Sequence, residues 1–164
     1  FLVSAIDRAL GRKRTMLLAG ALFILGKIWF VINPFSLGAI YVNAISVGIA
    51  ITITFVMFNT NRNNIVDLIE WQSGRRLDSL VSTADNLASK LAVAGATQLV
   101  AVALSANGFN AKLAQQPQAA IATINAILGW VPMAVAALMM IVILFLNIER
   151  DTKKMLAEKA ALAQ

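Results

Sequence analysis

The sequence contains no cysteine and no histidine among its 164 residues, and only 13% of the residues are charged. Without cysteine there is no disulfide, no cysteine-ligated zinc and no iron–sulfur centre. Without histidine the chain lacks the commonest general base and metal ligand, which excludes a catalytic triad. It also lacks a glycine loop of the P-loop or dinucleotide-binding type. We therefore expect neither an enzyme nor a resident metal or cofactor.

Apolar residues fill the composition instead, at 59% of the chain, and the mean hydropathy is +0.76. Soluble domains carry about 25% charged residues, roughly twice the fraction found here. The formal net charge is +6, which in a soluble protein would suggest nucleic acid. Here the basic residues flank apolar blocks, as they do around membrane spans. We expect a lipid environment and no nucleic-acid partner.

Four stretches approach or exceed the length of about 20 apolar residues that crosses a bilayer. They are residues 15–32, 36–58, 84–106 and 119–147. The last is longer than the hydrocarbon core, so it must tilt or protrude, and Pro132 can kink it. A water-soluble bundle would need a polar stripe on every helix, and segments 15–26 and 133–146 have none. The sequence predicts an all-α integral membrane protein.

Basic residues alternate between rich and poor connecting segments. Lys and Arg gather in segments 7–14, 59–83 and 149–164. The turn at 33–35 has no charge, and the loop at 107–118 has only Lys112. By the positive-inside rule, the three basic segments, including the C-terminal tail, are expected in the cytoplasm. The apolar residues 1–6 predict the end of a further helix, which gives four complete spans and one partial span.

Lys90 is the most informative polar residue because it lies in the apolar stretch 84–106, about 7 Å from its centre at helical rise. A charge near the bilayer centre costs about 2.5–3.5 kcal/mol, so it needs water or a counter-charge. Ser82, Asn86 and Lys90 are spaced by four and share one face, which can line a polar cavity. Asp85 lies about 140° away round the helix, so it is not the expected local partner. The alternative is that Lys90 pairs with a carboxylate on another helix and only fixes packing.

Lys27 is the other lysine inside an apolar stretch, about six residues from the outer end of the first span. Its long stem is expected to carry the ammonium group to the interface beside Trp29.

The segment 59–83 has more hydrogen-bonding side chains than a simple loop needs. Asparagines accompany several charged residues, among them Arg62, Asp67, Glu70, Arg75 and Arg76. We interpret it as the cytoplasmic end of the second membrane helix running into a polar gate, and a solvated loop is the alternative. A catalytic or metal-binding role for Asp67 and Glu70 is disfavoured because no histidine or third ligand lies near them.

These residues resemble the glycoside–pentoside–hexuronide:cation symporters, the melibiose-carrier group of the major facilitator superfamily. That family carries the pattern D-x-x-D-Y-x-E-x-x-x-G-x-R after its tenth helix, and then a helix with a lysine. Asp67, Glu70, Gly74 and Arg76 stand at the matching spacing, and Lys90 stands where the eleventh-helix lysine is expected.

The sequence departs from this pattern in places. Asn64 and Leu68 replace the first Asp and the Tyr, and Phe58-Asn59 replaces a Pro-Trp pair. Segment 7–14 is similar to the superfamily's basic loop after the second and eighth helices, with one extra residue. The residues that carry this similarity are Asp7, Arg8, Gly11 and Arg12.

The resemblance implies the C-terminal half of a twelve-helix carrier, from the end of helix eight through helix twelve. Such a carrier moves a sugar or glycoside together with Na⁺ or H⁺ by alternating access, in the cell membrane and together with its N-terminal half. Lys90, Asn86 and Asn59 are then expected to line the cavity, and the charged residues of segment 59–83 to form a cytoplasmic gate. The alternative is a membrane scaffold or assembly subunit that transports nothing.

Overall fold

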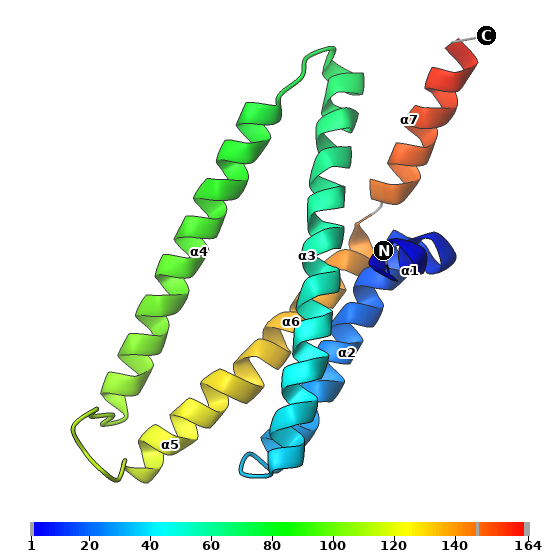
Figure 1. The fold of residues 1–164 in the computed structure, drawn as a ribbon. Helices are drawn as coiled ribbons and strands as arrows, with labels where there is room; N and C mark the ends of the chain where they lie inside the picture. The colour runs from blue at the N-terminus through cyan, green and yellow to red at the C-terminus, as the bar shows by residue number, and fades with distance from the viewer. Residues whose placement is uncertain (1, 147, 163–164) are drawn as a thin grey trace.

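The computed structural model describes residues 2–146 and 148–162, and the regular elements in these ranges are all helical. In chain order they are α1 (Leu2–Leu10), α2 (Arg12–Ile32), α3 (Leu37–Ser73), α4 (Asp78–Ala106), α5 (Gln118–Asn125), the π-helical turn η1 (Ala126–Trp130), α6 (Val131–Phe145) and α7 (Ile148–Leu162). Figure 1 shows a bundle of long helices that run up and down in turn. The predicted all-α fold is confirmed.

Four helical segments are long and apolar enough to cross a membrane, namely α2, α3, α4 and the run that begins with α5. Each overlaps one predicted span. α3 has 37 residues and is therefore about 55 Å long at helical rise, against a hydrocarbon core of about 30 Å. Its last turns must extend beyond the apolar layer.

Residues 59–73 continue α3, so most of the polar segment 59–83 is helix rather than loop. Neither glycine nor proline occurs between Gly48 and Gly74, and nothing in that stretch interrupts the helical hydrogen bonds. Gly74 then ends the helix in the left-handed conformation, at φ 67°, and its N–H donates to the Glu70 carbonyl at 2.9 Å.

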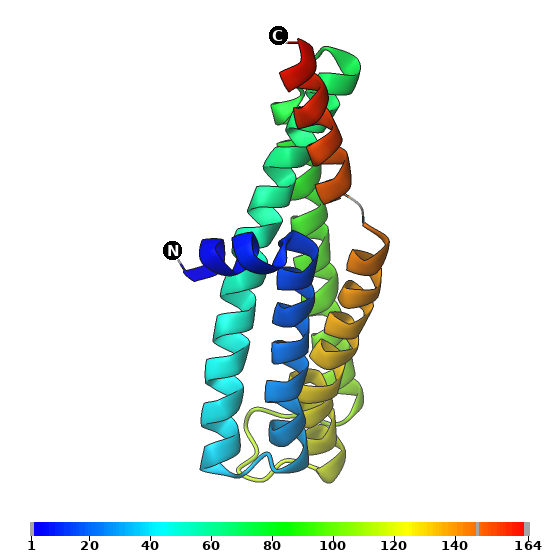
Figure 2. The ribbon, with the colours of Figure 1, turned by 90° about the vertical axis from the view of Figure 1, so that its right-hand side faces the viewer.

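The 33–36 turn and the 107–117 loop, which are poor in basic residues, lie at one end of the bundle, and the α3–α4 turn and α7 lie toward the other (Figure 1). α1 lies about halfway along the bundle, across the start of α2 rather than along it (Figure 2). Gly11, at φ 81°, makes this corner. The basic segments are therefore all away from the end that carries the two basic-poor connections.

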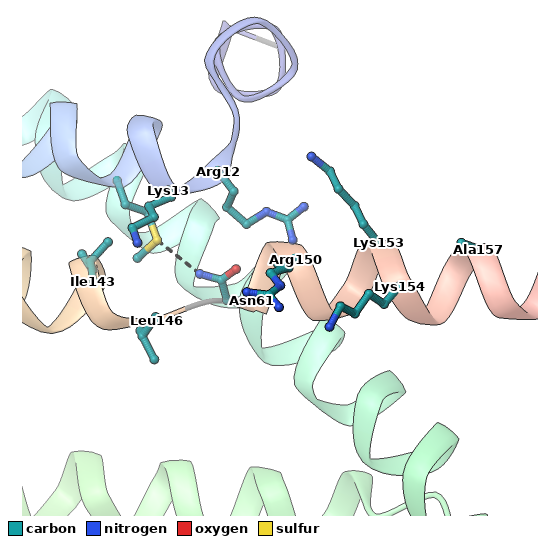
Figure 3. A pocket seen from close by; sticks show the side chains of 10 residues that line it. Arg12, Lys13, Asn61, Ile143, Leu146, Arg150, Lys153, Lys154 and Ala157 are labelled. Atoms are coloured by element: carbon teal, nitrogen blue, oxygen red, sulfur yellow. Dashed lines mark hydrogen bonds between the residues drawn. The ribbon is translucent and has the colours of Figure 1, made fainter.

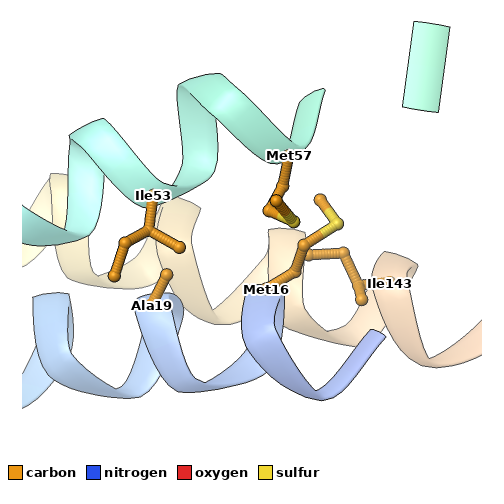
Figure 4. Packing of buried hydrophobic residues seen from close by; sticks show 5 residues of the cluster. All are labelled: Met16, Ala19, Ile53, Met57 and Ile143. Atoms are coloured by element: carbon orange, nitrogen blue, oxygen red, sulfur yellow. The ribbon is translucent and has the colours of Figure 1, made fainter. Parts of the chain in front are cut away.

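α2 is the central helix of the described packing. It contacts α3 along its length and α6 over part of it. Figure 4 shows the buried cluster between these three helices. Its members are Met16, Ala19, Ile53, Met57 and Ile143. Large apolar side chains are exposed elsewhere along the spans, as a lipid-facing surface requires.

Two glycines allow the central helix to approach its neighbours closely. A Cβ atom on Gly26 of α2 would overlap Ser46 Oγ of α3, and one on Gly129 of η1 would lie 2.5 Å from Val31 Cγ2 of α2. Small residues at such crossings let helix backbones pack without a hydrophobic driving force between them.

We predict that Gly26→Ala destabilises the protein by about 1–3 kcal/mol, because α2 and α3 must move apart to make room for the methyl group. Thermal unfolding in detergent micelles measures this. Gly95→Ala in α4 is the matched control, since a Cβ there meets nothing within 4 Å. Equal melting temperatures for the two variants would contradict the proposed close crossing.

Candidate functional site

Lys90 and Asn86 lie on α4, the helix with the least cover in the molecule. No residue of α4, which is described throughout, is buried. Both side chains are exposed, and Ser82, one turn earlier on the same face, is half-buried. Within the described ranges no carboxylate pairs with Lys90. Asn86 and Lys90 therefore lie on one face of α4, and no helix in the described ranges covers these two side chains.

Asn59, the third predicted cavity residue, lies on α3. Its side-chain Nδ2 donates to the Phe55 carbonyl of its own helix at 2.9 Å. This hydrogen bond stays within α3, and no described contact joins Asn59 to Lys90 or Asn86. The cavity predicted from these three residues is not assembled by this chain's own packing.

Arg62 and Asp85 form an ion pair between α3 and α4, with Arg62 Nη1 3.3 Å from Asp85 Oδ2. The side chains are 38% and 32% exposed. The pair borders a mostly apolar cavity of about 400 Å³ that Phe58 and Val142 also line. It is a direct side-chain connection between the two helices.

Arg76 organises a second charged group at the tip of the α3–α4 hairpin. Its Nε lies 2.6 Å from Asp78 Oδ2, and its Nη1 lies 3.9 Å from Glu70 Oε2. The hydrogen bond and charge of Asp78, followed by the charge of Glu70, raise the pKa of the Arg76 guanidinium. Arg76 therefore connects the end of α3 to the start of α4.

The predicted gate residues thus form two groups rather than one. Glu70 lies eight residues beyond Arg62 on the same helix, a distance of about 12 Å along its axis. Asp67 and Arg75 are exposed, and the Arg75 contacts are backbone hydrogen bonds with the Ser73 hydroxyl. Asp85, which pairs with Arg62, and Asp78, which pairs with Arg76, were not among the predicted gate residues. The available signal was that each is a carboxylate close in sequence to these arginines.

The basic segment 7–14 forms the corner between α1 and α2. Arg12 Nη2 lies 3.8 Å from Asp7 Oδ2, and the Gly11 N–H donates to the Asp7 carbonyl at 2.9 Å. Arg8 is exposed. Three of the four expected residues therefore meet at one structural corner.

Lys27 does not extend to the interface, and that expectation is wrong. Its side chain is buried, at 8% exposure, and its Nζ donates to the Leu128 carbonyl in η1 at 2.8 Å. The Phe23 and Phe30 rings lie 5.5 and 5.9 Å from Nζ. The sequence signal was Pro132: proline has no N–H, so a carbonyl in the preceding turn lacks its helical donor. Lys27 donates to the Leu128 carbonyl in that turn.

Replacing Lys27 with methionine should destabilise the protein by about 1–3 kcal/mol, because the Leu128 carbonyl loses its buried donor. Thermal unfolding in detergent measures the loss. The matched control is Lys112→Met in the exposed 107–117 loop. Unchanged stability of the Lys27 variant relative to this control would argue against the proline-compensating hydrogen bond.

Comparisons with known proteins point to one class of protein, the sugar transporters. The family model described as MFS/sugar transport protein matches residues 1–150. The chain is also 27% identical, over 156 residues, to an isoprimeverose transporter of Lactiplantibacillus pentosus. This alignment covers 92% of the chain and 32% of the relative, so the chain spans about a third of that protein's length. No solved structure matches it significantly.

The family match agrees with the four membrane-length helices, and together they identify a multi-pass membrane protein. The matched segment includes α1, both charged groups and the start of α7. The chain belongs to the MFS/sugar transport protein family.

Proposed function

We propose that this chain is the C-terminal part of a carrier that moves a sugar or glycoside across the cell membrane with Na⁺ or H⁺, by alternating access. The observation that carries the proposal is the uncovered polar face of α4. Lys90 and Asn86 lie exposed on a helix of membrane length. A membrane helix with such a face needs a water-filled or protein-lined space beside it.

The rest of the carrier would provide the other side of that space. In carriers built from two pseudo-symmetric halves, the substrate site lies near the bilayer midplane between them. Lys90 would reach into this site and pair with carboxylates of the N-terminal half. Cation binding would then compete with that ion pair or rearrange it, which couples the cation to sugar movement. The isoprimeverose transporter among the relatives makes isoprimeverose the first sugar to test.

The charged groups of α3 and α4 would act as cytoplasmic contacts. The Arg62–Asp85 pair and the Arg76 cluster both join α3 to α4 toward the end that carries the basic segments. By the positive-inside rule this end, with the C-terminal helix α7, faces the cytoplasm. Opening of the inner side would break or rearrange these contacts.

Lys90→Ala should abolish cation-coupled sugar uptake, because the site loses the lysine ammonium group that pairs with the carboxylates of the N-terminal half. Uptake of labelled sugar by membrane vesicles that hold the carrier at its natural length, with and without a Na⁺ or H⁺ gradient, measures this. Lys112→Ala, which removes an equal charge from the 107–117 loop, is the control and should transport normally. Normal coupled uptake by the Lys90 variant would overturn the role assigned to it.

Asp85→Asn should slow transport several-fold at unchanged membrane abundance, since it breaks the α3–α4 ion pair at its carboxylate. The pair is about one-third exposed, so its loss is expected to cost stability only about 0.2–1 kcal/mol. The exchange variant Arg62→Asp/Asp85→Arg restores opposite charges and should recover part of the rate. Full activity of Asp85→Asn would show that the pair does not contribute to the transport cycle.

The scaffold alternative predicts a different outcome from the same vesicles. A subunit that serves only assembly would give neither uptake nor counterflow of any sugar, with or without a gradient. Counterflow of labelled sugar that depends on Lys90 would exclude it.

A further inference from the structure

A cavity of about 580 Å³ lies where the start of α2, the middle of α3, the end of α6 and α7 meet. Five cationic residues line it, namely Arg12, Lys13, Arg150, Lys153 and Lys154 (Figure 3). They come from two segments more than 130 residues apart in the chain. Only folding brings these charges together, and neither the gate nor the predicted sugar site uses the residues of α7.

No described carboxylate lines the cavity. Asp7 pairs with one of the lining cations, Arg12, at 3.8 Å. Lys13 Nζ donates to the Leu144 carbonyl at the end of α6. On α7 the three basic residues lie at positions i, i+3 and i+4, which places them on one face of the helix. The cavity therefore presents a concentrated positive potential.

The other side of the cavity is apolar. Met16, Ile143, Leu146 and Ala157 line it. Met16 and Ile143 also line a second cavity, of about 410 Å³, between α2, α3 and α6. The lining of this second cavity is almost entirely apolar and includes Phe23, Val135 and Met139. A cationic cavity thus borders an apolar groove that follows the membrane helices, and Met16 and Ile143 line both.

We propose that this composite cavity binds an anionic phospholipid. The phosphate lies among the cations of α2 and α7, and an acyl chain lies in the apolar groove between α2 and α6. Basic pockets between membrane helices are suited to anionic headgroups, because the charges attract the phosphate while the helices solvate the tail. A free phosphate ion would use the cations alone and leave the apolar groove without a role. The bound lipid would hold α7 against the end of α2.

Native mass spectrometry of the carrier at its natural length, in detergent, tests the proposal with phosphatidylglycerol and phosphatidylcholine as probes. Phosphatidylglycerol should bind more tightly than phosphatidylcholine. The variant Arg150→Gln/Lys154→Gln should bind phosphatidylglycerol about 30-fold more weakly, as expected for two basic residues near the lipid phosphate. Lys112→Gln/Lys159→Gln removes the same charge from residues that do not line the cavity, and it should bind normally.

Ala157→Trp provides a second test that leaves every charge in place. The indole would fill the apolar side of the cavity, so phosphatidylglycerol binding should fall even though the net charge is unchanged. This variant keeps the test decisive if the charge variant fails to fold.

Three results would overturn the proposal. One is equal binding of phosphatidylglycerol by the lining and control double variants. Another is equal binding of the two lipids by the unmodified protein. The third is binding of inorganic phosphate that depends on Arg150 and Lys154 while phosphatidylglycerol binding does not, which would identify an anion site instead.

Discussion

The hydrogen bond between Lys27 and Leu128 illustrates the constraint on which this structure depends: a polar group inside a hydrocarbon layer must have a partner. Pro132 deprives a carbonyl of the preceding turn of its helical donor, and a lysine from the neighbouring helix donates to the Leu128 carbonyl of this turn at 2.8 Å. Two groups that would each be costly alone satisfy each other. The contact also fixes α2 against η1, and with it the position of the central helix in the bundle.

The same constraint explains why α4 differs from the other membrane helices. Lys27 is buried against another helix of this chain, whereas Lys90 lies exposed on a helix without a buried residue. On α2, Gly26 packs closely against α3, and Val31 packs against Gly129 of η1. On α4, Asn86 and Lys90 remain exposed. Under the proposed function, the rest of the carrier would pack against this surface.

The charged residues described above form three separate sets. The Arg62–Asp85 pair and the Arg76 cluster both join α3 to α4, at different heights. The basic residues of α2 and α7 instead surround a cavity with an apolar wall. The first two sets pair positive with negative charge within the chain, and the third brings five cations and no described carboxylate to one cavity lining. An excess of one sign around a cavity favours a ligand of the other sign.

Much of the architecture was predictable from the sequence, because the cost of placing polar backbone in lipid leaves few options for long apolar stretches. The four spans, the short turn after the first of them and the alternation of basic segments follow from this rule. The extent of α3 was less clear, since polar residues such as Asn59 and Arg62 suit a helix end and a loop equally well. The absence of glycine and proline before Gly74 was the signal that favoured helix.

Local composition and spacing were sufficient to predict the membrane helices and the family. Which polar groups meet depends on the tertiary structure. Lys27 turns inward to Leu128, Asp85 pairs with Arg62, and Arg150 joins Arg12 around one cavity. Such pairings depend on how each helix is rotated about its axis and on which neighbour it faces. Those choices are made by close packing at sites such as Gly26 and Gly129, whose partners lie far away in the chain.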